Sequence, residues 1–164
     1  DSSFARKSSS RMISAAPFSS EETVMLLKKG FPMVANLSES LGIPQSIIIT
    51  RGEMLEKFPE TSKRFLKGLI QGLQLARSNK QEAIKAGYEG GLKGDADTVS
   101  RSYDLYSPGY TSDLSFAMEG MQLMLDEDIR NGLVDKNMIL DKVINDRTLK
   151  RAQDELRKEG RLNP

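Results

Sequence analysis

The chain has 164 residues, of which 24 are basic and 23 acidic, giving a net charge of +1, and it contains neither cysteine nor histidine. This balance gives no electrostatic case for binding nucleic acid or an acidic membrane. Without cysteine or histidine the chain forms no disulfide, thiolate metal site, Ser-His-Asp triad or ordinary zinc site. We therefore expect a non-enzymatic protein with no metal and no cofactor.

The first segment, residues 1–11, is polar and charged and has no apolar core of the kind found in a signal peptide. We expect it to be a linker or a cut edge. No stretch of the chain approaches the roughly 18 apolar residues of a membrane span. The β-branched apolar run at residues 47–49 is typical of a buried strand.

The pattern from residue 12 to residue 37 predicts a strand, a helix and a second strand. An apolar run at 12–18 is followed by Ser19, which has Glu22 three residues later in the form of a capping box. The helix is expected over 21–29, because it ends with two lysines and is followed by Gly30, and the second strand is expected over 31–37. This order indicates a βαβ unit and hence a parallel sheet with a cleft at its edge.

The rest of the chain begins with a β-branched stretch and then becomes helical. Residues 42–51 open with turn residues and continue as a third strand. Apolar spacing, caps and breakers then predict a series of helices. We expect these over 53–58, from Pro59 to about Arg77, and over 81–88, 96–106, from Ser112 or Asp113 to Gly132, 134–142 and 146–159.

These elements predict an α/β fold in which a short parallel sheet is followed by many helices. Three strands are too few to cover that many helices. We therefore expect further strands to come from a missing N-terminal part or from a partner.

One candidate ligand site lies where the first strand meets its helix. Ser19, Ser20 and Glu21 occupy the position at which open α/β sheets bind ligands, and free backbone N–H groups there suit an anion. The alternative is a plain capping box, which needs no ligand to explain it. From the residues alone we interpret the segment as a capping box, because its carboxylates would repel an anion.

Two other features are each better explained by structure than by chemistry. The acidic triplet 126–128 lacks the spacing and glycine of a calcium loop, so we interpret it as a solvated face. Methionines at 118, 121 and 124 form part of an apolar helix stripe. Such a stripe could be an adaptable binding groove, but we favour packing into a core.

Tyrosines and glycines are interpreted in the same way. Tyr103, Tyr106 and Tyr110 surround a break at 107–109, and we expect aromatic packing rather than stacking on a ligand. The glycines between 87 and 94 lack the context of a phosphate loop and predict a joint between helices. Gly68 and Gly72 lie four residues apart on one helix and predict close packing against a neighbour.

Several segments resemble a known family. Ser-Ala-Ala-Pro-Phe-Ser-Ser-Glu-Glu at 14–22, Leu-Leu-Lys-Lys-Gly-Phe at 26–31, and the segments 48–51, 55–59 and 64–73 resemble periplasmic solute-binding proteins of ABC importers. The group in question is the nitrate, sulfonate, taurine and thiamine-precursor family. The resemblance covers residues 12–85 and becomes looser towards the end.

The resemblance implies the C-terminal part of a two-lobed type II periplasmic binding protein fold. Residues 12–45 would end the second lobe, and 46–164 would form a hinge strand and a helical return to the first lobe. The implied ligand-binding residues are Ser19, Ser20, Glu21, Thr50 and Arg51. Ser20 and Glu21 replace the family's prolines. An enzymatic branch of the family uses histidine and cysteine, which this chain lacks.

The implied function is solute capture for an ABC importer. The solute would be small and polar or anionic (a sulfonate, nitrate or pyrimidine-like molecule), the protein partner would be the importer permease, and the location periplasmic or extracytoplasmic. Contact with a membrane would occur only through the permease or a lipid anchor outside this chain. The alternative reading is a mainly helical protein-interaction or regulatory domain.

Overall fold

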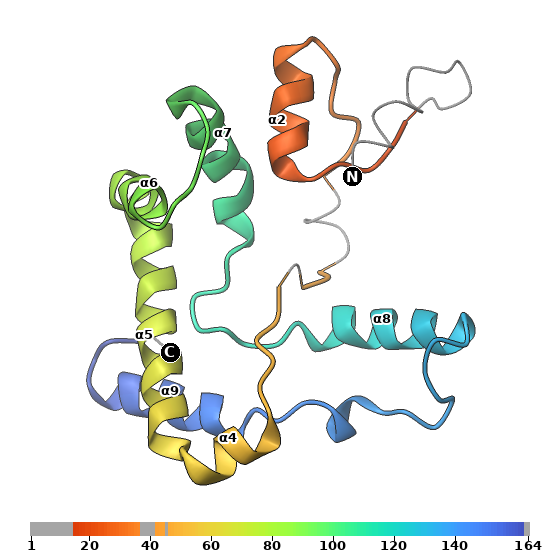
Figure 1. Cartoon of the computed structure of the whole chain (residues 1–164), viewed down its shortest axis with the longest axis vertical. Helices are drawn as coiled ribbons and strands as arrows, with labels where there is room; N and C mark the ends of the chain where they lie inside the picture. The colour runs from red at the N-terminus through yellow and green to blue at the C-terminus, as the bar shows by residue number, and fades with distance from the viewer. Residues whose placement is uncertain (1–14, 37–41, 45, 163–164) are drawn as a thin grey trace.

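The computed structural model describes residues 15–36, 42–44 and 46–162. The expected linker at 1–11, the start of the first strand and the end of the second lie outside them. The chain contains seven α-helices and two short 3-10 helices over the described part (Figure 1). They are α2 (Ser20–Lys28), α4 (Gly52–Lys57), α5 (Pro59–Ser78), α6 (Lys80–Glu89), α7 (Ala96–Tyr106), η1 (Ser107–Gly109), α8 (Met118–Arg130), η2 (Leu140–Lys142) and α9 (Arg147–Lys158).

The predicted α/β fold is wrong, because the described residues contain no strand and no sheet. Residues 15–18, 31–36 and 46–50, which were expected to be parallel strands, are single non-helical segments. A segment rich in β-branched residues forms a strand only where another strand pairs with it. The sequence of the segment does not show whether such a partner strand exists. The described chain is therefore an all-helical arrangement joined by irregular segments (Figure 1).

Helix starts follow the local signals in the sequence. Ser19 caps α2 in a complete capping box with Glu22. The side chain of Asn79 accepts from the Glu82 N–H at 3.1 Å and caps α6. Asp95 caps α7 in the same way, as expected. Each signal acts within three residues, so the sequence alone is enough to read it.

Two expected helices differ from the structure. α8 begins at Met118 instead of at 112 or 113, because the Asp113 carboxylate accepts from the N–H of Ser115 and holds a local turn. Leu114 lies inside this turn and has a φ of 64°, which a right-handed α-helix does not accommodate. The helix expected over 134–142 is wrong as well, since only the 3-10 turn η2 forms there.

The apolar core lies where α9 packs across α5 (Figure 1). Ile70 of α5 and Leu156 of α9 are fully buried there. Leu149, Ala152 and Leu162 complete the buried cluster, which Leu66, Leu114 and Phe116 flank. The helix expected over 146–159 is confirmed as α9, and its buried residues supply most of this cluster.

The helix α2 docks on α7, and Lys28 links the two. Val24 of α2 is 2% exposed. The Lys28 ammonium group lies 3.2 Å from the Asp95 carboxylate, 2.9 Å from that of Asp97 and 2.6 Å from the Thr98 hydroxyl. This contact ties the N-terminal helix to the far end of the α5–α6–α7 body.

The tyrosines at the end of α7 are partly buried, which agrees with the packing that the sequence predicted. The Tyr103 hydroxyl donates to the Ala76 carbonyl oxygen at 2.5 Å and joins α7 to α5. Burial raises the pKa of the Tyr110 hydroxyl.

The close packing expected at Gly68 and Gly72 is wrong, because a β-carbon at either position meets nothing within 4 Å. Among the described helices, none is long and apolar enough to cross a membrane.

Candidate functional site: an apolar groove beside α8

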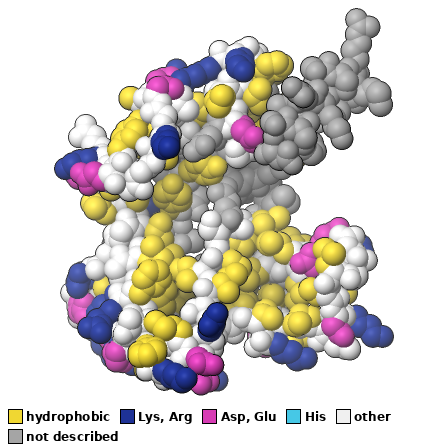
Figure 2. Space-filling view, viewed as in Figure 1, with side chains coloured by type: hydrophobic (Ala, Val, Ile, Leu, Met, Phe, Trp, Pro, Cys, Tyr) yellow, Lys and Arg dark blue, Asp and Glu magenta, His cyan; other side chains and the backbone are white. Residues whose placement is uncertain are grey.

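A groove of about 300 Å³ lies between α8 and the irregular segment that precedes α4. One wall comes from the segment and the other from a single face of α8. Figure 2 shows hydrophobic side chains at the surface in the region of α8. The lining residues are Pro44, Ser46, Ile47, Met121, Met124, Leu125 and Asp128.

A glycine brings the two walls together. Gly120 of α8 is buried, and a β-carbon built on it would lie 2.2 Å from the carbonyl oxygen of Gly42. Only glycine permits so close an approach of helix and backbone. The next residues on the same face of α8, at spacings of three and four, then line the groove.

The groove continues into an open apolar surface. Ile47, Ile48 and Ile49 are 52%, 50% and 83% exposed, and Met124 is 44% exposed. No backbone hydrogen bond joins residues 46–50 to any other described residue. The expectation that the methionine stripe packs into a core is therefore wrong for much of its length, and its alternative, a groove, describes the surface better.

The charged end of the groove is negative. Asp128 is partly buried and forms no ion pair with a described residue. Its neighbours in the acidic triplet are occupied: Asp126 accepts from the Gln122 amide at 2.7 Å, and Glu127 pairs with Arg130 at 2.5 Å. Asp128 also lies in the last turn of α8, where the helix dipole disfavours a carboxylate. A cation from outside would relieve both effects.

The five predicted ligand-binding residues are not gathered in one place. Ser19 belongs to the capping box, in which its N–H donates to a Glu22 carboxylate oxygen at 3.1 Å. That bond lowers the pKa of Glu22. Ser20 and Glu21 form the first turn of α2, and their side chains are not among those described.

Thr50 and Arg51, the other two predicted residues, are exposed and lie just before α4. The Arg51 carbonyl oxygen accepts from the Met54 N–H at 3.0 Å. Figure 1 shows α2 and α4 towards opposite ends of the molecule. The structure therefore does not bring the two groups of predicted residues together.

The groove could not be recognised from the sequence, because the residues of its two walls lie at least 74 positions apart in the chain. Asp128 was interpreted as part of a solvated acidic face, and Ile47 as part of a hinge strand. Two features of the sequence indicate the groove: the methionine stripe, interpreted as an adaptable binding surface, and Gly120 on the same helix.

The described residues contain no group of three or more histidine, cysteine, aspartate or glutamate side chains placed to hold a metal ion. No family model, curated protein or solved structure matches the chain.

Proposed function

We propose that this chain is a helical protein-interaction module whose groove beside α8 binds a segment of another polypeptide. The observation that carries the proposal is the open apolar surface of residues 47–49 next to Met121 and Met124. Contiguous exposed apolar surface with a polar rim marks interaction sites in proteins. Methionine side chains adapt to varied apolar partners, as binding grooves require.

The charge of the groove defines its partner further. Asp128 offers a carboxylate without an ion-pair partner in the described chain at one end of an otherwise apolar lining. The complementary occupant is a polypeptide segment that has apolar side chains and one lysine or arginine placed to reach Asp128. A small anion is a poor occupant, because Asp128 repels it and the lining offers few hydrogen-bond donors.

Selection of random displayed peptides against the protein tests this proposal. The wild type is expected to enrich apolar peptides that carry a lysine or arginine. Asp128→Lys is expected to shift the selection towards apolar peptides that carry aspartate or glutamate. The matched control is Asp126→Lys, two residues away on another face of α8, which should select the same peptides as the wild type. Peptides that show no common pattern, or that do not change with Asp128→Lys, contradict the proposal.

A second candidate function is solute capture for an ABC importer. The resemblance of residues 12–85 to solute-binding proteins favours it. The sheet on which the predicted binding cleft depended is absent from the described residues. The second candidate function therefore comprises binding of a solute and of the importer permease, without the two-lobed fold.

Melting temperature in the presence of taurine, nitrate, an alkyl sulfonate or a pyrimidine separates the two candidates. A solute at about 100 times its dissociation constant stabilises its binding protein by about 2.7 kcal/mol. For a chain of this size that corresponds to a rise of roughly 5–10 °C. A rise with one solute supports capture, whereas an unchanged melting temperature across the panel, with peptide binding at the groove, supports the interaction module.

A further inference from the structure

If the groove beside α8 binds polypeptide segments, as proposed above, the chain itself carries a segment of the required chemistry. Residues 47–51 are three isoleucines followed by Thr50 and Arg51. All five of these residues are exposed. The segment therefore offers apolar side chains and one cation, and these are the two features that the apolar lining and Asp128 complement.

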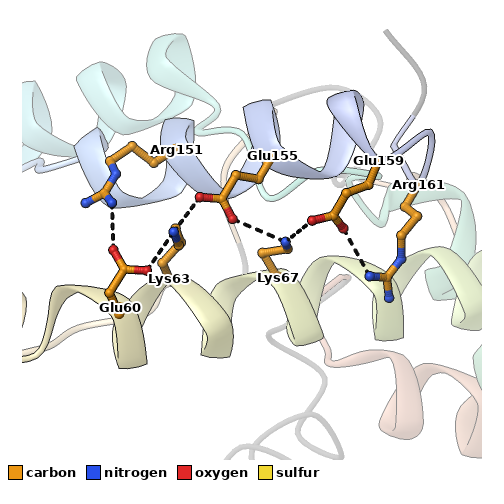
Figure 3. A network of polar contacts seen from close by, with 7 residues as sticks. All are labelled: Glu60, Lys63, Lys67, Arg151, Glu155, Glu159 and Arg161. Atoms are coloured by element: carbon orange, nitrogen blue, oxygen red, sulfur yellow. Dashed lines mark hydrogen bonds and ion pairs between the residues drawn. The ribbon is translucent and has the colours of Figure 1, made fainter.

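The charges of Arg51 and Asp128 are available for a contact with another chain. Many charged residues pair within the chain, as in the row between α5 and α9 in Figure 3, where Lys67 lies 3.3 Å from Glu155 and 2.6 Å from Glu159. By contrast, neither Arg51 nor Asp128 forms an ion pair with a described residue. Their charges are opposite, and since they do not meet within one chain they can meet between two.

The backbone beside the groove is also unpaired in the single chain. No backbone hydrogen bond joins residues 46–50 to any other part of the described chain. Isoleucine and threonine favour strands, and a row of unpaired N–H and C=O groups is a template for pairing with another chain. Antiparallel pairing with a second copy of the segment would satisfy these groups and cover the isoleucines.

We propose that two copies of this chain form a symmetric dimer in which their segments 46–50 pair as antiparallel strands, so that each segment covers the groove of the other copy. A two-fold axis at Ile48 places Ile47 of each copy opposite Ile49 of the other. The segment is therefore complementary to itself. Such an interface closes after two copies and gives a dimer instead of a fibre.

The alternation of side chains along a strand then directs Arg51 towards Asp128. Residues two positions apart lie on the same face of a strand, and residues opposite each other in an antiparallel pair point to the same side. Ile47 lines the groove, so the residue opposite it faces α8, and so does Arg51, two positions further along the second copy. In this register Arg51 falls between the positions of Pro44 and Ser46, which line the same groove as Asp128. By symmetry the contact forms twice.

Sedimentation equilibrium of the full chain tests the dimer through its charges. The wild type is expected to be a dimer. Arg51→Glu places two carboxylates together at each contact, and Asp128→Lys places two cations together, so each variant should dimerise at least about a hundredfold more weakly than the wild type. An equimolar mixture of the two variants should form dimers again, because both contacts then join opposite charges. A variant that merely fails to fold cannot recover on mixing.

Arg64→Glu is the matched control for the change of net charge. Arg64 is exposed on α5, and no described residue forms an ion pair with it, so this variant should dimerise as the wild type does. The inference is overturned if the wild type stays monomeric at millimolar concentration. A mixture of Arg51→Glu and Asp128→Lys that stays monomeric overturns it as well.

A synthetic peptide that copies residues 46–51 separates this dimer from the proposed function of the groove. The Arg51→Glu variant keeps Asp128 and leaves the groove open, so it should bind the peptide, whereas Asp128→Lys should not. A monomeric wild type that binds apolar, basic peptides contradicts the dimer and leaves the proposed function standing. A wild type that neither dimerises nor binds such peptides contradicts both.

Discussion

Gly120 on α8 lies directly against the carbonyl group of Gly42, so closely that a β-carbon on Gly120 would sit 2.2 Å from that oxygen. This contact is the point at which an irregular segment and a helix, far apart in the chain, become the two walls of one groove. The wall spacing therefore depends on the absence of a side chain at one position.

Gly120→Ala is expected to force the walls apart. The added methyl group overlaps the backbone of Gly42, which cannot move aside as a flexible side chain would. We expect a loss of about 1–3 kcal/mol in the free energy of unfolding, measured by chemical denaturation. Gly72→Ala is the matched control. Its β-carbon meets nothing within 4 Å at this exposed position of α5, so the substitution should stabilise the chain by about 0.5–1 kcal/mol. Equal effects of the two variants would contradict the close approach at Gly120.

Leu156→Ala tests whether α9 and α5 share the core. Leu156 is 0% exposed, so truncation leaves a cavity and should cost about 2–5 kcal/mol of unfolding free energy. The same substitution at Leu75, which is 50% exposed on α5, should change stability by less than about 0.5 kcal/mol. Denaturant titration of both variants gives the comparison. A Leu156→Ala variant as stable as Leu75→Ala would show that α9 does not dock as described.

Asn79→Ala tests the joint between α5 and α6. Its side chain caps α6 by accepting from the Glu82 N–H, and loss of such a cap costs about 1 kcal/mol. Asn79→Asp, which keeps the acceptor, is the control and should retain most of the stability. Far-UV circular dichroism during thermal unfolding reports both. No difference between alanine and aspartate at this position would mean that the cap is not formed.

Asp95→Asn tests the docking of α2 on α7. Bonds from Thr98 and Lys28 hold the pKa of Asp95 well below its ordinary value of 3.8. Its stabilising charge is therefore present above that value and is lost as the pH falls further. The asparagine variant keeps the cap but loses the ion pair with Lys28, so its stability should fall less steeply below about pH 4 than that of the wild type. Denaturation midpoints measured across that range give the slope, and identical slopes would contradict the bonds from Thr98 and Lys28 that keep the Asp95 carboxylate charged.

The sequence predicts the helical part of this chain well where the signals are local. The caps at Ser19, Asn79 and Asp95 each act on an N–H three residues later, so no distant residue is needed to recognise them. The start of α8 was misplaced because Asp113 binds a nearby N–H in a turn instead of capping a helix.

The strands and the groove could not be predicted in the same way, because both depend on distant partners. Ile47, Ile48 and Ile49 have strand-forming side chains, but strand formation needs a neighbour that the described chain does not supply. The groove needs Gly42 to meet Gly120, a contact that no local pattern encodes. Asp128 becomes a candidate binding residue only because that contact forms the groove. In the sequence it resembles its solvated neighbours.

The amide hydrogens of Ile47, Ile48 and Ile49 provide the most direct test of the account, measured by nuclear magnetic resonance on the isolated protein. If the apolar segment beside α8 is open, all three amides exchange rapidly in the monomer, and no contact is seen between the backbone protons of these residues and those of Ala15 or Val34. Slow exchange together with such contacts would reveal the parallel sheet and contradict the helical fold and its groove.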